Sequence, residues 1–380
     1  MNKNCFKLQG ALKRLTSSGF FPTPATRRQE VVEKESKMEY LVGSKQIFLD
    51  YLNKLEKKDR IGVISHNDLD GVASAILINE ILKLKNMKIR GINFVNYKKG
   101  IFEKSAEIFA RKKINKIFLC DVGIDSDSEE FEELRKSFDI FYIDHHPSEI
   151  KGENIIKTKT ADCIAFTIYE TARQNFDLSK LEWLVCATMV SEFSYKDENN
   201  FNFLKEHYPE IKLETIMGSE PGEMSKKISS SLIYLKGKEE KVFRLILKNK
   251  LSCLEKYQKI VDEEIKNLVE KFKSEAQFYP EQNLYLYQAH PKFSVTSVVT
   301  TILSTKEPEK TFIFISDIED EPEFLKVSSR HQNGKEDMGQ LMKKGIEGME
   351  NATAGGHIPA AAARFMKKDL EKFKENLLGK

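Results

Sequence analysis

Short apolar runs alternate with amphipathic stretches between about Arg60 and Asp144. The runs RIGVISH, MKIRGINFVNY, KIFLCD and FDIFYID are rich in β-branched and aromatic residues, which is typical of strands. The stretches between them, VASAILINEILKLK, EKSAEIFARKK and SEEFEELRKS, have apolar residues at helical spacing. Strands and helices that alternate at this length predict a parallel sheet covered by helices on both faces.

The hydrophobic pattern changes twice along the rest of the chain. From Ser179 to Phe278 it is mostly helical and ends in a long, charge-rich helix, whereas strand-like runs such as NLYLYQA and KTFIFISD return after Tyr279. A helix is also predicted from Met38, over MEYLVGSKQIFLDYLNKLEKK. We therefore predict an α/β protein in which a helical connector joins a parallel-sheet domain to a smaller α/β domain. The expected ranges are 38–200 for the first domain, 201–276 for the connector and 277–380 for the second domain.

The composition describes a globular chain with enough apolar residues for buried cores. Of its 380 residues, 40% are hydrophobic and 31% are charged, and the net charge of +3 means that any basic surface has to be local. The five cysteines form no CxxC pair, which favours reduced thiols in the cytoplasm. No apolar run reaches the roughly 18 residues of a membrane helix, and the first residues lack a signal-peptide core. We expect a cytoplasmic protein that does not enter membranes.

Residues 1–37 differ in character from the rest. The stretch SSGFFPTPATRR carries turn and breaker residues and basic ends with little periodicity, so we expect a flexible basic arm. Three alternatives stay open for it: an arm that helps to hold nucleic acid, plain disorder, or a stretch upstream of a true translation start at Met38.

Ligand-type side chains close three of the predicted strands. His66, Asp121 and Asp144 each stand at the end of an apolar run. In open α/β sheets, ligands bind outside the carboxyl ends of the strands, where loops from several strands converge. The three residues therefore predict a site at this edge of the sheet.

The segment HNDLDG spaces three potential metal ligands two residues apart. In an extended segment alternate side chains point the same way, so His66, Asp68 and Asp70 can share one face. A calcium loop of the EF-hand type is excluded, because Leu77 occupies the position that needs a bidentate glutamate. A helix start is an alternative interpretation, since aspartate and glycine are common there.

The segment FYIDHHPSE places Asp144, His145 and His146 side by side at a strand end. Adjacent strand residues point apart, so a core role for one histidine does not account for the other. Asp121 alone has the alternative of a turn aspartate. Carboxylates and imidazoles without cysteine suit Mn²⁺ or Mg²⁺ rather than a structural zinc. Several such groups from separate strands suit two metals that share a carboxylate, which is the chemistry of phosphoester hydrolysis.

Taken in order, these motifs resemble the DHH phosphoesterase superfamily. The resemblance rests on HNDLDG, the strand-closing Asp121, the Asp144-His145-His146 triplet and Gly355-Gly356-His357 followed by alanines, and it covers about residues 60–375. It implies that 38–200 is the DHH catalytic domain and that 277–380 is the DHH-associated, substrate-binding domain.

The resemblance also implies a set of metal ligands for two Mn²⁺ ions, with Mg²⁺ as the alternative. His66 and Asp68 match ligands of one metal, Asp70 and His145 match ligands of the other, and Asp121 matches the carboxylate that bridges them.

Two neighbours of these ligands have implied roles, and one position departs from the family pattern. Asp144 is expected to orient the adjacent imidazoles, and His146 is expected to face the substrate phosphate. The family normally supplies a further aspartate to the second metal, but here Glu192, in ATMVSEF, stands in its place. The extra methylene shifts the ligand oxygen, which puts the affinity for the second metal in doubt.

The resemblance places substrate-binding residues in the second domain. Gly355, Gly356 and His357 match the substrate loop of the family, where glycines let backbone N–H groups approach a phosphate. In KVSSRHQ, Ser328 and Arg330 match residues that contact the substrate, and arginine binds phosphate in a bidentate manner. A tight turn is the alternative for the two glycines taken alone.

Three functions follow from the resemblance. The compact HNDLDG motif favours a RecJ-like exonuclease that hydrolyses single-stranded DNA or RNA. The first alternative is a nanoRNase or phosphoadenosine-phosphate phosphatase that acts on short oligonucleotides or nucleotides. The second is a catalytically weakened scaffold of the replisome, and the archaeal relatives also associate with the GINS replication complex.

Overall fold

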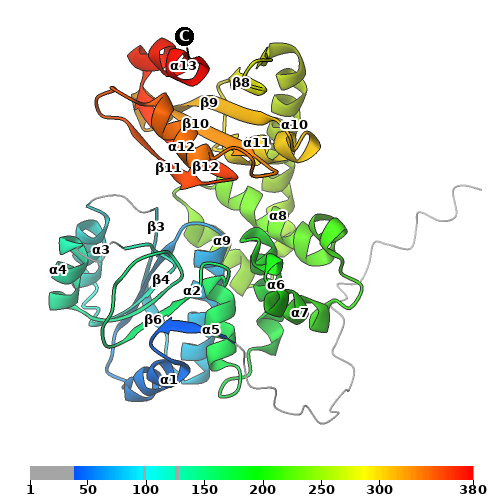
Figure 1. Ribbon diagram of the computed structural model, residues 1–380. Coiled ribbons are helices and arrows are strands. Elements are labelled where there is room, and N and C mark those ends of the chain that lie inside the picture. The colour runs from blue at the N-terminus through cyan, green and yellow to red at the C-terminus, as the bar shows by residue number, and fades with distance from the viewer. Residues whose placement is uncertain (1–37, 97–99, 125–127, 380) are drawn as a thin grey trace, which may run out of the picture. The chain divides into compact units, whose positions relative to one another are not determined.

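The computed structural model describes residues 38–96, 100–124 and 128–379, and the predicted arm (1–37) lies outside them. The described chain forms two six-stranded sheets with helices packed against them (Figure 1). Among the described residues, no helix is long and apolar enough to cross a bilayer.

The first sheet is built mainly from the strands that the apolar runs predict. Its strands are β1 (Tyr40–Val42), β2 (Ile61–His66), β3 (Ile89–Val95), β4 (Lys116–Cys120), β5 (Asp139–Asp144) and β6 (Ile155–Thr158). The spatial order is β1-β6-β5-β4-β2-β3, and the neighbours are parallel except for the antiparallel pair of β1 with β6. The parallel sheet is confirmed, with an antiparallel strand added at one edge.

The prediction of a helix from Met38 is wrong for its first residues. Tyr40–Val42 is strand β1, and helix α1 begins only at Lys45. Gly43 explains the break, because its φ of +77° suits glycine and a Cβ atom there would lie 2.1 Å from the carbonyl oxygen of Ile155. The chain therefore turns at Gly43, after pairing with β6.

Helices cover both faces of this sheet, as the alternation of elements predicts. They are α1 (Lys45–Lys54), α2 (Leu69–Leu84), α3 (Ile101–Arg111), α4 (Glu129–Ser137) and α5 (Ile164–Ala172). Successive strand residues belong to different cores, since Phe118 packs in the cluster with α2 whereas Leu119 packs in the cluster with α3 and α4. Two buried faces explain why the strands read as continuous apolar runs.

A helical region follows the first sheet. It consists of α6 (Glu182–Ser191), α7 (Glu198–His207), α8 (Glu220–Tyr234), α9 (Glu239–Leu247) and α10 (Glu255–Glu275), with short 3-10 turns at Ser179–Leu181, Ser194–Lys196, Leu213–Gly218 and Leu251–Leu254. Val185 of α6 and Phe243 of α9 belong to the same core cluster as α2. Helix α10 divides between two cores: Tyr257 packs in this cluster, whereas Val261 and Phe272 pack in a cluster with the second sheet.

The second sheet is mostly antiparallel. Its strands are β7 (Gln277–Tyr279), β8 (Leu284–Gln288), β9 (Thr311–Ile318), β10 (Glu321–His331), β11 (Thr353–His357) and β12 (Ala360–Met366), in the order β11-β12-β10-β9-β8-β7. Only β8 and β9 run parallel. Its helices are α11 (Thr296–Lys306), α12 (Met338–Gly345) and α13 (Leu370–Leu378), with a 3-10 turn at Lys367–Asp369. Residues of α11 pack in one core cluster, and those of α12 and α13 in another.

Candidate metal centre

The polar residues predicted to form a site come together because their strands are neighbours. Strands β5, β4 and β2 lie side by side and run parallel. His66 closes β2, Asp121 follows β4 and Asp144 closes β5. The carboxyl ends of parallel strands meet at one edge of the sheet, so these side chains converge as the sequence predicts.

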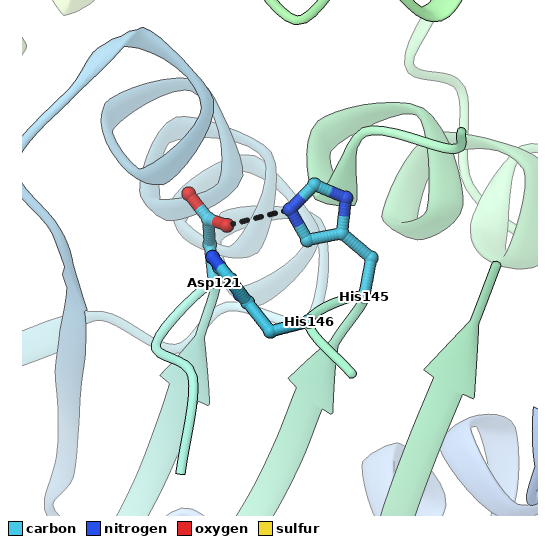
Figure 2. A group of neighbouring side chains, drawn as sticks. All are labelled: Asp121, His145 and His146. Atoms are coloured by element: carbon cyan, nitrogen blue, oxygen red, sulfur yellow. Dashed lines mark ion pairs between the residues drawn. The ribbon is translucent and has the colours of Figure 1, made fainter. Parts of the chain in front are cut away.

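Two groups of possible metal ligands share Asp121. One consists of His66, Asp68 and Asp121 and the other of Asp121, His145 and His146, with the ligand atoms of each group within 4.8 Å of one another. Oδ2 of Asp121 lies 3.7 Å from Nδ1 of His66. Its Oδ1 lies 3.3 Å from Nε2 of His145, the ion pair drawn in Figure 2. The two oxygens of one carboxylate thus face two different histidines, which is the arrangement of a bridging ligand.

Asp121 has an unusual backbone and an orphaned side chain. Its φ is +57°, in the left-handed region, while its backbone N–H donates to the carbonyl oxygen of Ile143 at 3.0 Å. The residue is only 2% exposed, and its Oδ2 has no hydrogen-bond partner among the described residues. A strained backbone that carries a buried, unsatisfied carboxylate is typical of a functional position.

The tautomer of His145 supports a cation between it and Asp121. Its Nδ1 lies 2.7 Å from the backbone oxygen of Asp162, which can only accept, so Nδ1 carries the proton. Burial and the neighbouring His146 lower the pKa of His145. A neutral ring then directs the lone pair of Nε2 at an oxygen of Asp121, and two electron-pair donors that face each other fit a shared cation.

Several carboxylates lie around Asp121. Burial raises the pKa of Asp121 well above its usual range, and the charges of Asp70, Asp68 and Glu192 raise it further. Burial together with Asp68 and Asp70 also raises the pKa of Glu192, which ends α6. Four mutually repelling carboxylates, two of them buried (Asp70 and Asp121) and two half-buried (Asp68 and Glu192), fit a divalent cation. Oxygen and nitrogen donors without sulfur fit Mn²⁺ or Mg²⁺. The residues present therefore suit the metal that the resemblance implies.

Helix α2 begins inside the HNDLDG motif, and this changes the reason for its spacing. The helix starts at Leu69, so Asp70 lies in its first turn and the extended-segment explanation is wrong for that residue. Asp68 is the N-cap, and its side chain accepts from the N–H of Gly71 at 3.0 Å. A Cβ atom on Gly71 would lie 2.1 Å from the oxygen of His66, so only glycine fits. The segment is therefore a helix start, and it also brings the side chains of His66 and Asp68 to within 2.7 Å of each other.

Asp70 lies near the other carboxylates and also caps helix α5. Its two oxygens accept from the backbone N–H groups of Ile164 and Ala165, each at 2.7 Å, at the start of α5. Burial and the charge of Asp68 raise its pKa to about 7. Asp70 thus joins α2 to α5 beside the two ligand groups.

Asp144 forms hydrogen bonds with His146, whereas His145 is bonded to the backbone oxygen of Asp162. Asp144 is fully buried, and its Oδ1 lies 2.8 Å from Nδ1 of His146. Its Oδ2 accepts from the N–H of His146 at 2.9 Å and from Nζ of Lys157 at 3.2 Å. Burial opposes ionisation of Asp144, but His146 and Lys157 outweigh it and lower the pKa. Of the two imidazoles, Asp144 therefore orients His146, and the carbonyl of Asp162 orients His145.

Lys157 was missed by the sequence reasoning. It lies in β6, is 2% exposed, and donates to Asp144, to the backbone oxygen of His146 and, at 2.5 Å, to Oγ of Ser148. A lysine inside the β-prone run IIKTKT was the available signal, because a buried lysine needs a partner.

His146 remains partly open to solvent. Its side chain is 42% exposed, and a Cβ atom on Gly123 would lie only 3.1 Å from its ring. Gly123 therefore leaves room for the ring, whose exposed part can meet a ligand.

The predicted substrate residues come together on the second sheet. Strand β12 pairs with β10 on one side and with β11 on the other, so Ala362 faces both Ser328 and Gly355, and Ala360 faces both Arg330 and His357.

The glycines of this group lie in a strand, so the prediction of a loop is wrong for them. Gly355 and Gly356 belong to β11, and the hairpin to β12 turns after His357. Gly356 has φ +147°, and a Cβ atom on it would lie 2.4 Å from Cα of Ala361, so a side chain would clash with the paired strand. Gly356 and His357 also line a pocket of about 390 Å³.

Arg330 is suited to an anion. It is half-buried, its Nε has no hydrogen-bond partner among the described residues, and burial lowers its pKa. A partly desolvated guanidinium with an unpaired Nε is available to a phosphate.

Comparisons with known proteins agree with this fold. The family model "DHH family, N-terminal domain" matches residues 60–210, which contain all the predicted metal ligands. The crystal structure of exonuclease RecJ bound to manganese shares the fold, with a TM-score of 0.66 and 14% identity over 88% of this chain and 93% of that one. Residues 60–210 therefore form a DHH-family domain, and the chain shares the fold of RecJ. This confirms the predicted fold class.

Two further structures share this fold. RecJ in complex with Mn²⁺ from Thermus thermophilus has a TM-score of 0.65 and 13% identity over 88% of this chain, which spans only 54% of the Thermus protein. CDC45 from Entamoeba histolytica has a TM-score of 0.52 and 12% identity over 88% of this chain and 98% of that one. No curated protein matches the sequence significantly.

Proposed function

We propose that this DHH protein is a metal-dependent exonuclease that hydrolyses phosphodiester bonds in single-stranded DNA or RNA. The observation that carries the proposal is the sharing of Asp121 between two ligand groups at adjacent strand ends. A pair of cations at such a carboxylate is the arrangement that serves phosphoester hydrolysis. The similarity to RecJ structures, two of them with manganese, favours nucleic acid as the substrate.

The proposed metal ligands are His66, Asp68, Asp70, Asp121, His145 and Glu192. Two bound Mn²⁺ ions, with Mg²⁺ as the alternative, would neutralise phosphate charge and lower the pKa of a coordinated water. Asp70 already accepts two backbone N–H groups, so it can offer a cation only its remaining lone pairs.

The chain's own residues bind and orient the phosphate in this proposal. The exposed ring of His146 meets the substrate phosphate, and Asp144 and Lys157 keep that ring in place. We further propose that residues 277–380 form a DHH-associated domain in which Ser328, Arg330, Gly355, Gly356 and His357 hold the strand. Hydrolysis adds water at phosphorus and breaks one P–O ester bond, and the departing sugar oxygen takes a proton.

A replisome scaffold is the second candidate, and two observations favour it. Glu192 stands where the family has an aspartate, and its repulsion by Asp68 and Asp70 raises its pKa. CDC45 shares the fold. In this alternative the protein binds GINS-type replication proteins, and its metal centre contributes little to activity.

One experiment separates these candidates. The purified protein is incubated with Mn²⁺ and four substrates: end-labelled single-stranded DNA, single-stranded RNA, a dinucleotide and phosphoadenosine phosphate. Asp121→Asn serves as the matched control, because asparagine tolerates the left-handed backbone. Ladders from the long strands support the exonuclease. Cleavage of only the dinucleotide or the nucleotide supports the short-substrate alternative. If no substrate is cleaved in an Asp121-dependent manner, the result supports the scaffold function.

A further inference from the structure

A groove of about 590 Å³ lies between β3 and α9, and none of the residues assigned to metal or substrate line it. Three consecutive residues of β3, namely Ile92, Asn93 and Phe94, form one wall. The other wall comes from α9 and the turn before it, and it includes Lys238, Lys241, Arg244, Leu245 and Lys248.

The β3 wall is a free sheet edge. Strand β3 is the last in its sheet and pairs only with β2, and within the described residues no further backbone hydrogen bond involves Ile92, Asn93 or Phe94. All three are half-buried. Proteins usually protect such an edge with charges, prolines or bulges. Here the register irregularity lies at the start of the strand, between Ile89 and Gly91, and the three lining residues carry neither charge nor proline.

The opposite wall carries excess positive charge. Arg244 donates to Glu240 at 2.6 Å, and the buried Glu239 accepts from the N–H of Gly237 at 2.7 Å, so both acidic residues are already engaged. Lys238 and Lys248 are exposed, and neither has a carboxylate partner among the described residues. The groove therefore presents at least two cations without counter-charges.

The groove also has an apolar floor that is held in place. The ring of Phe94 lies 5.9 Å from that of Phe243, which belongs to the main core of the first sheet. Ile92 and Leu245 are half-buried beside it and pack against the same core. Apolar side chains on a ligand would therefore find a surface that is already formed.

We propose that this groove docks an extended, acidic and partly apolar segment of a partner protein, which adds a strand to the edge of β3. Main-chain hydrogen bonds to the free edge provide affinity, apolar side chains contact the floor, and carboxylates face the lysines. A nucleic acid strand would satisfy the lysines but could not pair with the N–H and C=O groups of a strand edge. The proposal does not depend on the nuclease activity.

The first test uses the full chain and a synthetic peptide in which Asp or Glu alternates with Val or Ile. Binding of the fluorescein-labelled peptide is followed by anisotropy. A twin methylated on alternate backbone nitrogens, made in both registers, keeps the side chains but cannot pair with the edge. We expect saturable binding of the parent peptide, and at least a tenfold weaker affinity for the twin in one register.

The second test changes the protein. Lys238→Glu combined with Lys248→Glu should weaken binding about tenfold, since each pair of exposed charges contributes a few-fold. The matched control is Lys54→Glu combined with Lys57→Glu, two exposed lysines in and just after α1, and it should leave affinity unchanged. The proposal is overturned if the parent peptide does not bind, or if both methylated twins bind as tightly as the parent peptide. It is also overturned if the two double variants have the same affinity for the parent peptide. A further contrary result is displacement of the peptide by oligothymidylate that is lost when Lys238 and Lys248 are replaced by glutamate.

Discussion

Substitution of Lys157 by methionine removes the only lysine or arginine in contact with the buried Asp144 among the described residues. Lys157 lies 3.2 Å from Oδ2 of Asp144, and the two residues are 2% and 0% exposed. Removal of one partner from a buried ion pair costs about 3–5 kcal/mol. We expect a loss of about 3 kcal/mol in the free energy of unfolding, at the lower end of that range, because Asp144 still accepts from His146.

The same substitution should slow hydrolysis. Without Lys157, Asp144 tends to take up a proton and then holds His146 less firmly. Loss of a residue that orients a site group costs about 10–100-fold in activity. Stability is measured by urea unfolding, and activity by Mn²⁺-dependent cleavage of the most readily hydrolysed labelled strand.

Lys159→Met is the matched control for Lys157→Met. Lys159 lies two residues further on and pairs with Asp197 at 2.7 Å, but its side chain is 30% exposed, so we expect a cost of about 1 kcal/mol or less. Equal losses in the free energy of unfolding for the two variants would refute the role of Lys157 as the partner of Asp144. So would a Lys157→Met protein with unchanged stability and cleavage rate.

Three further predictions concern other charged groups. Asp121→Asn removes a repelled carboxylate, so the metal-free protein should melt no lower than the parent while the stabilisation by Mn²⁺ disappears; calorimetry that shows the parent's Mn²⁺ shift in the variant would contradict this. Glu192→Asp should tighten Mn²⁺ binding and raise the cleavage rate, and unchanged values in a metal titration would mean that Glu192 does not limit the second metal. Burial opposes protonation of His207, but its ion pair with Glu182 at 3.2 Å outweighs this and raises the pKa above 6.5. Protonation of His207 therefore stabilises the fold below pH 6.5, and this contribution disappears as pH rises through the folded pKa, so the cost of His207→Gln in urea unfolding should be larger at pH 5.5 than at pH 8.5.

The ends of the main strands were predictable because they depend on local pattern. His66, Asp121 and Asp144 follow apolar runs that can only be buried strands, and parallel strands bring their carboxyl ends together. Strand β1 was not predictable, because three residues before Gly43 form a strand only by pairing with β6, more than 100 residues along the chain.

The supporting contacts of the site were harder to foresee than its ligands. The cap that Asp70 provides for α5 joins residues 94 positions apart, and the bond from Lys157 to Asp144 depends on the register of β5 with β6. A single sequence carries no record of either distance. The motif could therefore indicate the ligands, but not which group fixes each of them in place.

Helix α10 has a consequence for any attempt to divide the protein. One end of the helix supplies Tyr257 to the first core, and the rest supplies Val261, Leu268 and Phe272 to the core with the second sheet. A fragment that ends at residue 276 would carry an uncovered apolar stripe, and the remaining fragment would lack part of its interior. The two sheets should therefore melt together in a single transition, and each should aggregate when it is expressed alone.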